Sequence, residues 1–146
     1  MKEVFGDAFD LIKNYNSLCI TTNGYVKNNG ACVMGRGIAL TAARKYFMLP
    51  FMIGTRIKKF GNHVCKIELP DIQLYMFPVK HNWYEVADIE LIKRSCHELM
   101  NQIAPEEKVL LPRPGCGNGH LKWTDVKPIL EPILDDRISI VHWSLD

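Results

Sequence analysis

Two kinds of hydrophobic pattern alternate along the chain: short uninterrupted apolar runs, and longer segments with apolar residues three and four positions apart. Apolar runs bounded by turn residues indicate buried strands, and the wider spacing indicates helices with one buried face. The clearest helix is expected over 87–103, where Ile89, Ile92, Cys96 and Leu99 share one face. The pattern thus predicts a chain in which strands and helices take turns.

Turn residues and prolines set the limits of several elements. Pro50 suits the first turn of a helix, because that turn leaves its N–H groups unpaired, and Gly61 suits the end of the same helix. Pro70-Asp71 predicts a turn between two strands. The first predicted strand is short and closes with Val4-Phe5; the others are 17–22, 64–69, 72–78, 108–112 and 137–143. The predicted helices are 38–47, 50–60, 87–103 and 123–134, the last with Pro128 and Pro132 as kinks or breaks.

This order of elements predicts a single domain over residues 1–146 with the α/β fold class. We expect a three-layer α/β/α sandwich around a mixed, largely parallel central sheet. In such sheets the ligand site lies beyond the carboxyl ends of the strands. Asp7, Asn23, Lys80 and the segment after Pro112 all follow predicted strands. We therefore expect the functional site at that edge of the sheet.

Two glycine-rich segments lead into predicted helices, Gly30–Leu40 and Arg113–Trp123. Without a Cβ, glycine adopts positive φ and lets a phosphate approach the backbone amides, so two such loops predict a diphosphate held between them. For either loop alone, glycines that only form turns and helix caps are the alternative. The P-loop pattern is absent, and Leu40 breaks the dinucleotide-binding pattern that begins at Gly35.

Composition narrows the class of protein. With 146 residues, 47% of them hydrophobic, the chain is long enough for one core without disulfides or a metal. A net charge of +2 from 18 basic and 16 acidic residues does not predict tight binding to duplex nucleic acid. Five cysteines, none in a CxxC pattern, predict a reducing, cytoplasmic setting. Neither a signal-peptide pattern nor an apolar stretch near the ~20 residues of a membrane span is present, so we expect no membrane partner.

Five short segments, in this order, resemble those of macrodomains, the ADP-ribose-binding fold. They are Gly6-Asp7, Thr22-Asn23-Gly24, Val33–Ala39, Phe77-Pro78-Val79-Lys80 and Gly115–Gly119. The resemblance covers nearly the whole chain. In its details it is similar to the branch with the DNA ADP-ribosyl glycohydrolase antitoxins and the terminal ADP-ribose glycohydrolases, and to small stand-alone macrodomains of phages and bacteria. It implies a monomer that binds ADP-ribose or a derivative, without a cofactor or metal.

The resemblance also implies roles for single residues. Asp7, with Ala8, would contact the adenine, since a carboxylate accepts from its exocyclic amine; capping of a following helix is the alternative. Asn23 would hold the hydroxyls of the distal ribose, or only form an Asn-Gly turn. Trp143 would stack on the adenine or pack at the edge of the core. The diphosphate would be held mostly by backbone amides, in one loop of Gly35, Arg36, Gly37 and Ile38, and in the other of Gly115, Cys116, Gly117, Asn118 and Gly119.

Three residues are candidates for catalysis: Lys80, Asn23 and His120. Lys80, at the end of a strand in Phe-Pro-x-Lys, resembles the catalytic lysine of the glycohydrolase branch. An ammonium stabilises a leaving oxygen, and a lysine with a lowered pKa can attack an anomeric carbon; a solvated lysine is the alternative. His120 is a candidate acid or base, or a surface residue. Cys116 is interpreted as a small loop residue, because no matched histidine or asparagine pattern of a thiol hydrolase is present.

The chain also departs from the pattern of its branch. Gly119 stands where the terminal glycohydrolases carry an acidic residue, so a mechanism with lysine and aspartate does not transfer whole. A glycine at this position resembles the DNA-directed antitoxins. The segment from Asn23 to Gly35 is longer than in those antitoxins. Three functions follow: a hydrolase that removes ADP-ribose from a modified nucleic acid or protein, an ADP-ribose 1″-phosphate phosphatase, and a non-catalytic ADP-ribose reader.

Overall fold

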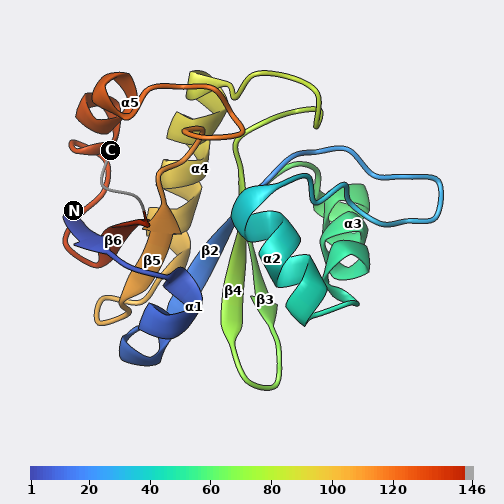
Figure 1. Ribbon diagram of the computed structural model, residues 1–146, viewed down its shortest axis with the longest axis horizontal. Helices are drawn as coiled ribbons and strands as arrows, with labels where there is room; N and C mark the ends of the chain where they lie inside the picture. The colour runs from blue at the N-terminus through green and yellow to red at the C-terminus, as the bar shows by residue number, and fades with distance from the viewer. Residues whose placement is uncertain (144–146) are drawn as a thin grey trace.

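A six-stranded sheet forms the middle layer of the computed structural model, which describes residues 1–143 (Figure 1). Its strand order is β1-β6-β5-β2-β4-β3, and only β3 runs antiparallel to its neighbour. The predicted mixed, largely parallel sheet is thus confirmed. The strands are β1 (Lys2–Phe5), β2 (Ser17–Thr22), β3 (Cys65–Glu68), β4 (Gln73–Pro78), β5 (Val109–Pro112) and β6 (Ile138–His142).

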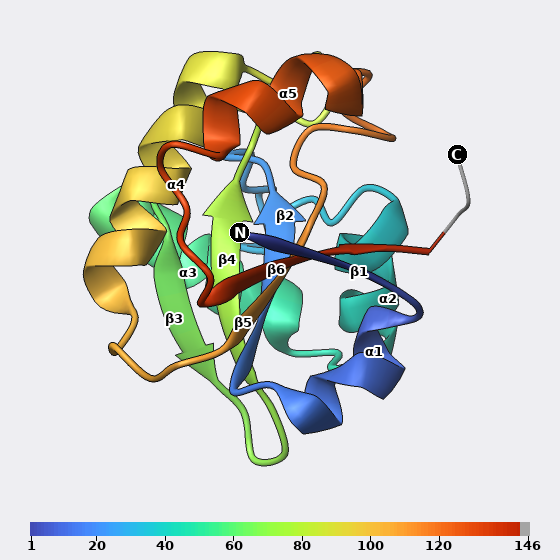
Figure 2. The ribbon, with the colours of Figure 1, turned by 90° about the vertical axis from the view of Figure 1, so that its left-hand side faces the viewer.

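Helices cover both faces of the sheet and complete the three predicted layers (Figures 1 and 2). On one face lie α1 (Ala8–Leu11), the 3-10 helix η1 (Ile12–Asn14), α2 (Gly37–Lys45) and α3 (Leu49–Phe60). On the other face lie α4 (Ile89–Gln102) and α5 (Trp123–Leu130). Each face has its own hydrophobic cluster.

The central strands are buried on both faces, which explains their uninterrupted apolar sequences. In β2, Leu18 and Ile20 belong to the cluster beneath α2 and α3, whereas Cys19 between them belongs to the cluster beneath α4. Successive side chains of a strand point to opposite faces, so one apolar run supplies both cores.

No helix in the described part of the chain has the length and apolar character needed to cross a membrane.

The observed elements depart from the predicted ones by more than two residues in two places. Helix α5 ends at Leu130 rather than at residue 134; it contains Pro128, and Pro132 lies in the turn that follows. A second proline within one turn removes another N–H donor, so the helix does not continue. The short elements α1 and η1 were not predicted, because four and three residues are too few to show a period.

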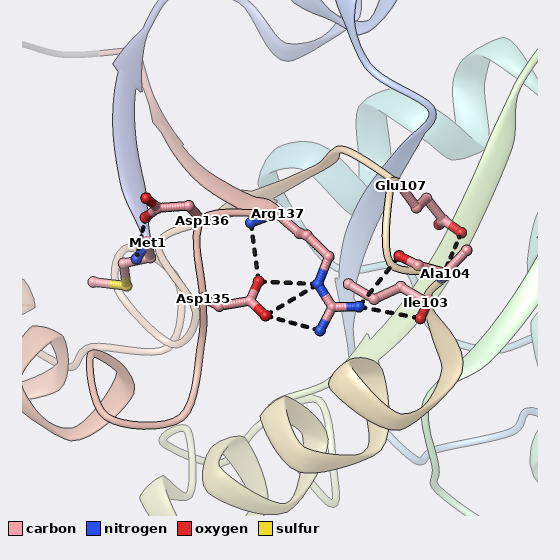
Figure 3. A network of polar contacts seen from close by, with 7 residues as sticks. All are labelled: Met1, Ile103, Ala104, Glu107, Asp135, Asp136 and Arg137. Carbon is pink, nitrogen blue, oxygen red and sulfur yellow. Dashed lines mark hydrogen bonds and ion pairs between the residues drawn. The ribbon is translucent and has the colours of Figure 1, made fainter.

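A polar network joins α4 to the start of β6 at the amino ends of the parallel strands (Figure 3). One guanidinium nitrogen of Arg137 donates to the carbonyl oxygens of Ile103 and Ala104 at 3.3 and 3.2 Å. Arg137 also pairs with Asp135 at 2.8 Å and lowers the pKa of that carboxyl group, while the N-terminal amino group pairs with Asp136 at 3.1 Å. The network therefore fixes the edge of the sheet opposite the predicted site.

Candidate functional site

The carboxyl ends of the parallel strands open onto a cleft of about 860 Å³, within the usual size range of ligand sites. It lies at the edge of the sheet that the sequence predicts. Its walls come from the ends of β2 and β6, from the two glycine loops and from the segment after β4. The predicted site residues that line it are Asn23, Gly35, Arg36, Gly37, Ile38, Lys80, Gly115, Cys116, Gly117, Asn118, Gly119 and Trp143.

Three predicted residues do not line the cleft: Asp7, Ala8 and His120. The carboxylate of Asp7 accepts from the backbone N–H of Phe9 at 2.8 Å, so its alternative role as the cap of α1 is confirmed, and Ala8 is buried in the first turn. His120 is exposed, at a φ of 65°. Contact of Asp7 and Ala8 with a ligand stays a prediction, and the position of His120 does not support a catalytic role.

Asn23 holds the base of the first glycine loop. Its side-chain Nδ2 donates to the carbonyl of Val33 at 2.7 Å, and its Oδ1 accepts from the backbone N–H of Tyr25 at 2.9 Å. The expected turn role is confirmed, and the buried amide still lines the cleft. Cys32 lies against the carbonyl of Asn23 at 3.5 Å, and burial raises the pKa of its thiol to about 12.

Helix α3 fixes the far end of this loop. The carbonyl of Gly30 approaches Gly54 so closely that a Cβ at Gly54 would collide with it. The backbone N–H of Cys32 donates to the carbonyl of Pro50 at 2.9 Å, in the first turn of the same helix. Only glycine permits such an approach of backbone to helix. The first loop is therefore a fixed wall of the cleft.

The cleft end of the first loop is open. Gly35 and Gly37 have φ values of 59° and 65°, a region that side chains with a Cβ rarely adopt. A Cβ at Gly37 would meet nothing within 4 Å, and one at Gly35 would meet only Nδ2 of Asn118 at 3.8 Å. Glycine at these two positions adopts the positive φ of the loop and leaves open space beside the cleft.

Glycines of the second loop serve two different purposes. Gly115 is buried at a φ of 77°, and a Cβ there would lie 2.8 Å from Ile92 and 2.9 Å from Leu121. A Cβ at Gly119 would collide with the backbone of Gly115. Gly117, in contrast, is exposed at a φ of 114° with nothing within 4 Å. Two of these glycines are needed for packing, and the third borders open space.

The residues that line the cleft, among those described, include no aspartate or glutamate. The close contact at Gly119 explains part of this, since an acidic side chain there would displace the backbone of Gly115. Basic side chains line the cleft in contrast: Arg36, Lys80, Arg113 and Lys122. Such a cleft favours an anionic ligand.

Lys80 follows β4 and is only 7% exposed, so its interpretation as a solvated lysine is wrong. Its Nζ donates to the carbonyl of Asn118 at 3.0 Å and to that of Trp83 at 3.3 Å. Burial lowers the pKa of Lys80. The amine is therefore held between the second glycine loop and its own loop by neutral carbonyl groups.

Several residues that line the cleft were not predicted from the sequence. The hydroxyl of Thr22, next to Asn23, is buried without a hydrogen-bond partner. Trp83 follows Lys80 by three residues, and Arg113 lies with its guanidinium 5.1 Å from the ring of Trp123. Position next to Asn23 was the available signal for Thr22, and Trp83 had no such signal. Trp143 is exposed, so packing at the edge of the core does not explain it.

No model of a protein family matches the sequence, and no curated protein matches it. Among solved structures, the macrodomain of Mycobacterium tuberculosis DarG has a TM-score of 0.76 and 22% identity, over 98% of this chain and 97% of that one. The macrodomain of Thermus aquaticus DarG has a TM-score of 0.76 and 21% identity, over 98% and 97%.

A third similar structure contains a ligand. Thermosipho africanus DarTG, solved in complex with ADP-ribose, has a TM-score of 0.78 and 21% identity, over 99% of this chain and 42% of that one. These similarities extend over almost all of the described residues and agree with the sheet order and the layers. The chain thus has the macrodomain fold.

Proposed function

We propose that this chain binds ADP-ribose in the cleft and hydrolyses the bond between ADP-ribose and a modified macromolecule, nucleic acid or protein. The fold is that of the DarTG structure in complex with ADP-ribose. Two glycine loops with open positive-φ positions border a cleft whose described lining has four basic side chains and no carboxylate. A diphosphate has the size and charge that such loops accept.

The proposed binding mode assigns one half of the ligand to each end of the cleft. The diphosphate would lie between Gly35–Ile38 and Gly115–Gly119, close to backbone N–H groups. The adenine would lie toward the end of β6, near Asp7, Ala8 and Trp143. The distal ribose would then lie toward Asn23 and Lys80, where the second N–H of the Asn23 amide can reach a hydroxyl.

The buried amine of Lys80 is the single observation that supports catalysis. As an ammonium it would stabilise the leaving atom as the bond to the anomeric carbon breaks. As a neutral amine it would attack that carbon as the bond to the macromolecule breaks, which gives a covalent intermediate; water would then displace the amine and release ADP-ribose. Burial lowers its pKa and so favours the neutral form. Neither route needs a carboxylate in the cleft.

The test compares wild type with Lys80→Ala on ADP-ribosylated DNA and ADP-ribosylated protein. Turnover should fall at least ~10²-fold, as is typical for loss of an acid–base or charge-stabilising group. The Kd for ADP-ribose should change little, because backbone amides elsewhere hold the diphosphate. Lys93→Ala removes a cation on the outer face of α4 and should leave both values unchanged. Equal turnover in wild type and Lys80→Ala would contradict the proposal.

The pH profile distinguishes the two roles of Lys80. If the neutral amine reacts, kcat rises with pH and levels off below the pKa of an ordinary lysine, because the pKa of Lys80 is lowered. If the ammonium acts, kcat falls over the same range. Lys80→Ala should remove either dependence.

The four basic side chains also favour a second candidate, an ADP-ribose 1″-phosphate phosphatase. A dianionic phosphate beside Lys80 would lose a binding partner in Lys80→Ala, so KM for this substrate should rise together with a fall in kcat. If wild type converts neither modified macromolecule nor ADP-ribose 1″-phosphate, the chain is a reader of ADP-ribose.

A further inference from the structure

The small net charge of the chain conceals a strong separation of charge. Nine of the 18 lysines and arginines lie between residues 11 and 67, a range with no aspartate or glutamate. The other nine share the rest of the chain with all 16 acidic residues. The range 11–67 includes η1, β2, the first glycine loop, α2, α3 and most of β3. Helices α2 and α3, which lie next to each other in Figure 1, therefore carry basic side chains and no acidic ones.

Three loops from this part of the chain and from the Lys80 segment meet beside the cleft. The backbone N–H of Gly24 donates to the carbonyl of His81 at 3.1 Å. Nδ2 of Asn62 donates to the carbonyl of Lys80 at 3.0 Å, and the Asn62 side chain packs against Gly24. The end of α3, the start of the first glycine loop and the segment after β4 thus form one continuous surface.

Large aromatic side chains are exposed around this meeting point. Tyr25 follows Gly24, Phe60 ends α3 two residues before Asn62, and Trp83 and Tyr84 follow Lys80. Lys58 and Lys59 are exposed directly before Phe60, and the ammonium of Lys59 lies 5.2 Å from the ring of Phe60. We call this surface the aromatic rim; its residues are Tyr25, Lys58, Lys59, Phe60, Trp83 and Tyr84.

Two carboxylates on neighbouring elements pair with basic side chains. Asp88 pairs with His81 at 2.9 Å, and Glu98 contacts His63 at 2.6 Å and Arg94 at 3.7 Å. Glu85, next to Tyr84, has one carboxylate oxygen that is buried without a hydrogen-bond partner. The rim therefore presents rings and ammonium groups to solvent.

We propose that the aromatic rim binds a single-stranded polynucleotide, DNA or RNA, even when that strand is unmodified. Bases would stack on the exposed rings, and phosphates would contact the lysines, which is how sequence-tolerant single-strand sites work. A duplex hides the faces of its bases, so it would gain only the phosphate contacts. Trp83 belongs both to the rim and to the lining of the cleft. The bound strand would thus run past Lys80, so nucleic acid would be the modified macromolecule of the proposed function. Strand binding by the rim does not depend on the proposed function; only this assignment of the substrate rests on it.

The experiment measures the binding of fluorescently labelled strands of about 12 nucleotides by anisotropy, with poly-dT and poly-U strands and a duplex of equal length. Both single strands should bind, and more tightly than the duplex. Trp83→Ala should weaken binding at least fivefold, the loss expected for one stacked base. A variant with Lys58→Ala and Lys59→Ala should lower the slope of log Kobs against log salt by about 1.4, or about 0.7 for each phosphate contact.

Two variants outside the rim serve as matched controls. Phe47→Ala removes an aromatic side chain that is 79% exposed between α2 and α3, and Lys93→Ala removes a cation on α4. Neither should change strand binding. The proposal is overturned if single strands do not bind at low salt, or if the controls lose as much affinity as the rim variants. It is also overturned if phosphatidylserine vesicles bind to the rim and strands do not.

Calorimetry with ADP-ribose separates this inference from the proposed function. If ADP-ribose does not bind but single strands do, the hydrolase proposal fails and the rim stands. If ADP-ribose binds and is released from substrates but unmodified strands do not bind, the rim proposal fails alone.

Discussion

The two glycine loops of the cleft differ in what their glycines are for. In the first loop, Gly35 and Gly37 are exposed, and no packed side chain stands where their Cβ atoms would be. In the second, Gly115 and Gly119 are buried against other atoms, and only Gly117 is open. A sequence shows the same letter at all five positions. The structure separates glycines that let the chain pack from glycines that leave room for a ligand.

This difference makes opposite predictions for substitutions a few residues apart. A packing glycine should affect the free energy of unfolding, and an open glycine should affect mainly the Kd for ADP-ribose. The comparison fails if the two groups respond alike.

The largest effect is expected for Gly115→Val. The new side chain would overlap Ile92 and Leu121 and would also be held at positive φ, so we expect a loss of about 3 kcal/mol or more in the free energy of unfolding. Urea denaturation followed by circular dichroism measures it. A loss below about 1 kcal/mol would show that the loop tolerates a side chain there.

Gly117→Val and Gly35→Val should weaken ADP-ribose binding by about 100-fold or more, because a branched side chain would fill the space beside the proposed diphosphate. The unfolding free energy should fall by only the ~1–3 kcal/mol of strain that a side chain with a Cβ meets at positive φ. Calorimetry gives the Kd, which we expect to be micromolar in wild type, or roughly −7 to −9 kcal/mol. Wild-type affinity in both variants would assign these glycines to turns alone.

The smallest change in the free energy of unfolding is expected for a substitution of Lys80, whose amine contacts the second loop. Lys80→Met removes a buried amine whose hydrogen bonds, among the described residues, go to two neutral carbonyl groups, so the protein should become more stable by about 1 kcal/mol while turnover is lost. Thermal unfolding with and without ADP-ribose measures this. A destabilised variant would show that the two hydrogen bonds of Nζ outweigh the burial of its charge.

The sequence was sufficient for most of the fold because its strands are buried on both faces. Apolar runs such as 17–22 coincide with β2, and Gly61 ends α3 as expected. The end of α5 was missed because a helical period continues through Pro132, although its missing N–H cannot support the helix. The short α1 left no period to detect, but its cap at Asp7 had been considered.

The parts of the candidate site that the backbone forms were predicted well from the sequence. The parts that depend on the direction of a side chain were predicted poorly. Both loops, Asn23 and Lys80 were identified from glycines and strand ends, and all line the cleft. Thr22 and Trp83 were missed because their role depends on where a side chain points, which no spacing reveals. Net charge was also misleading, since a sum over the chain removes the separation between residues 11–67 and the rest.

The attachment of the first glycine loop to α3 has a consequence for binding kinetics. With Gly30 against Gly54, Cys32 bonded to Pro50 and Asn23 across the base, this wall is in place before a ligand arrives. Little conformational entropy then remains to be lost on association. The observed rate of ADP-ribose binding should rise in proportion to concentration without reaching a plateau, since no loop closure follows the encounter.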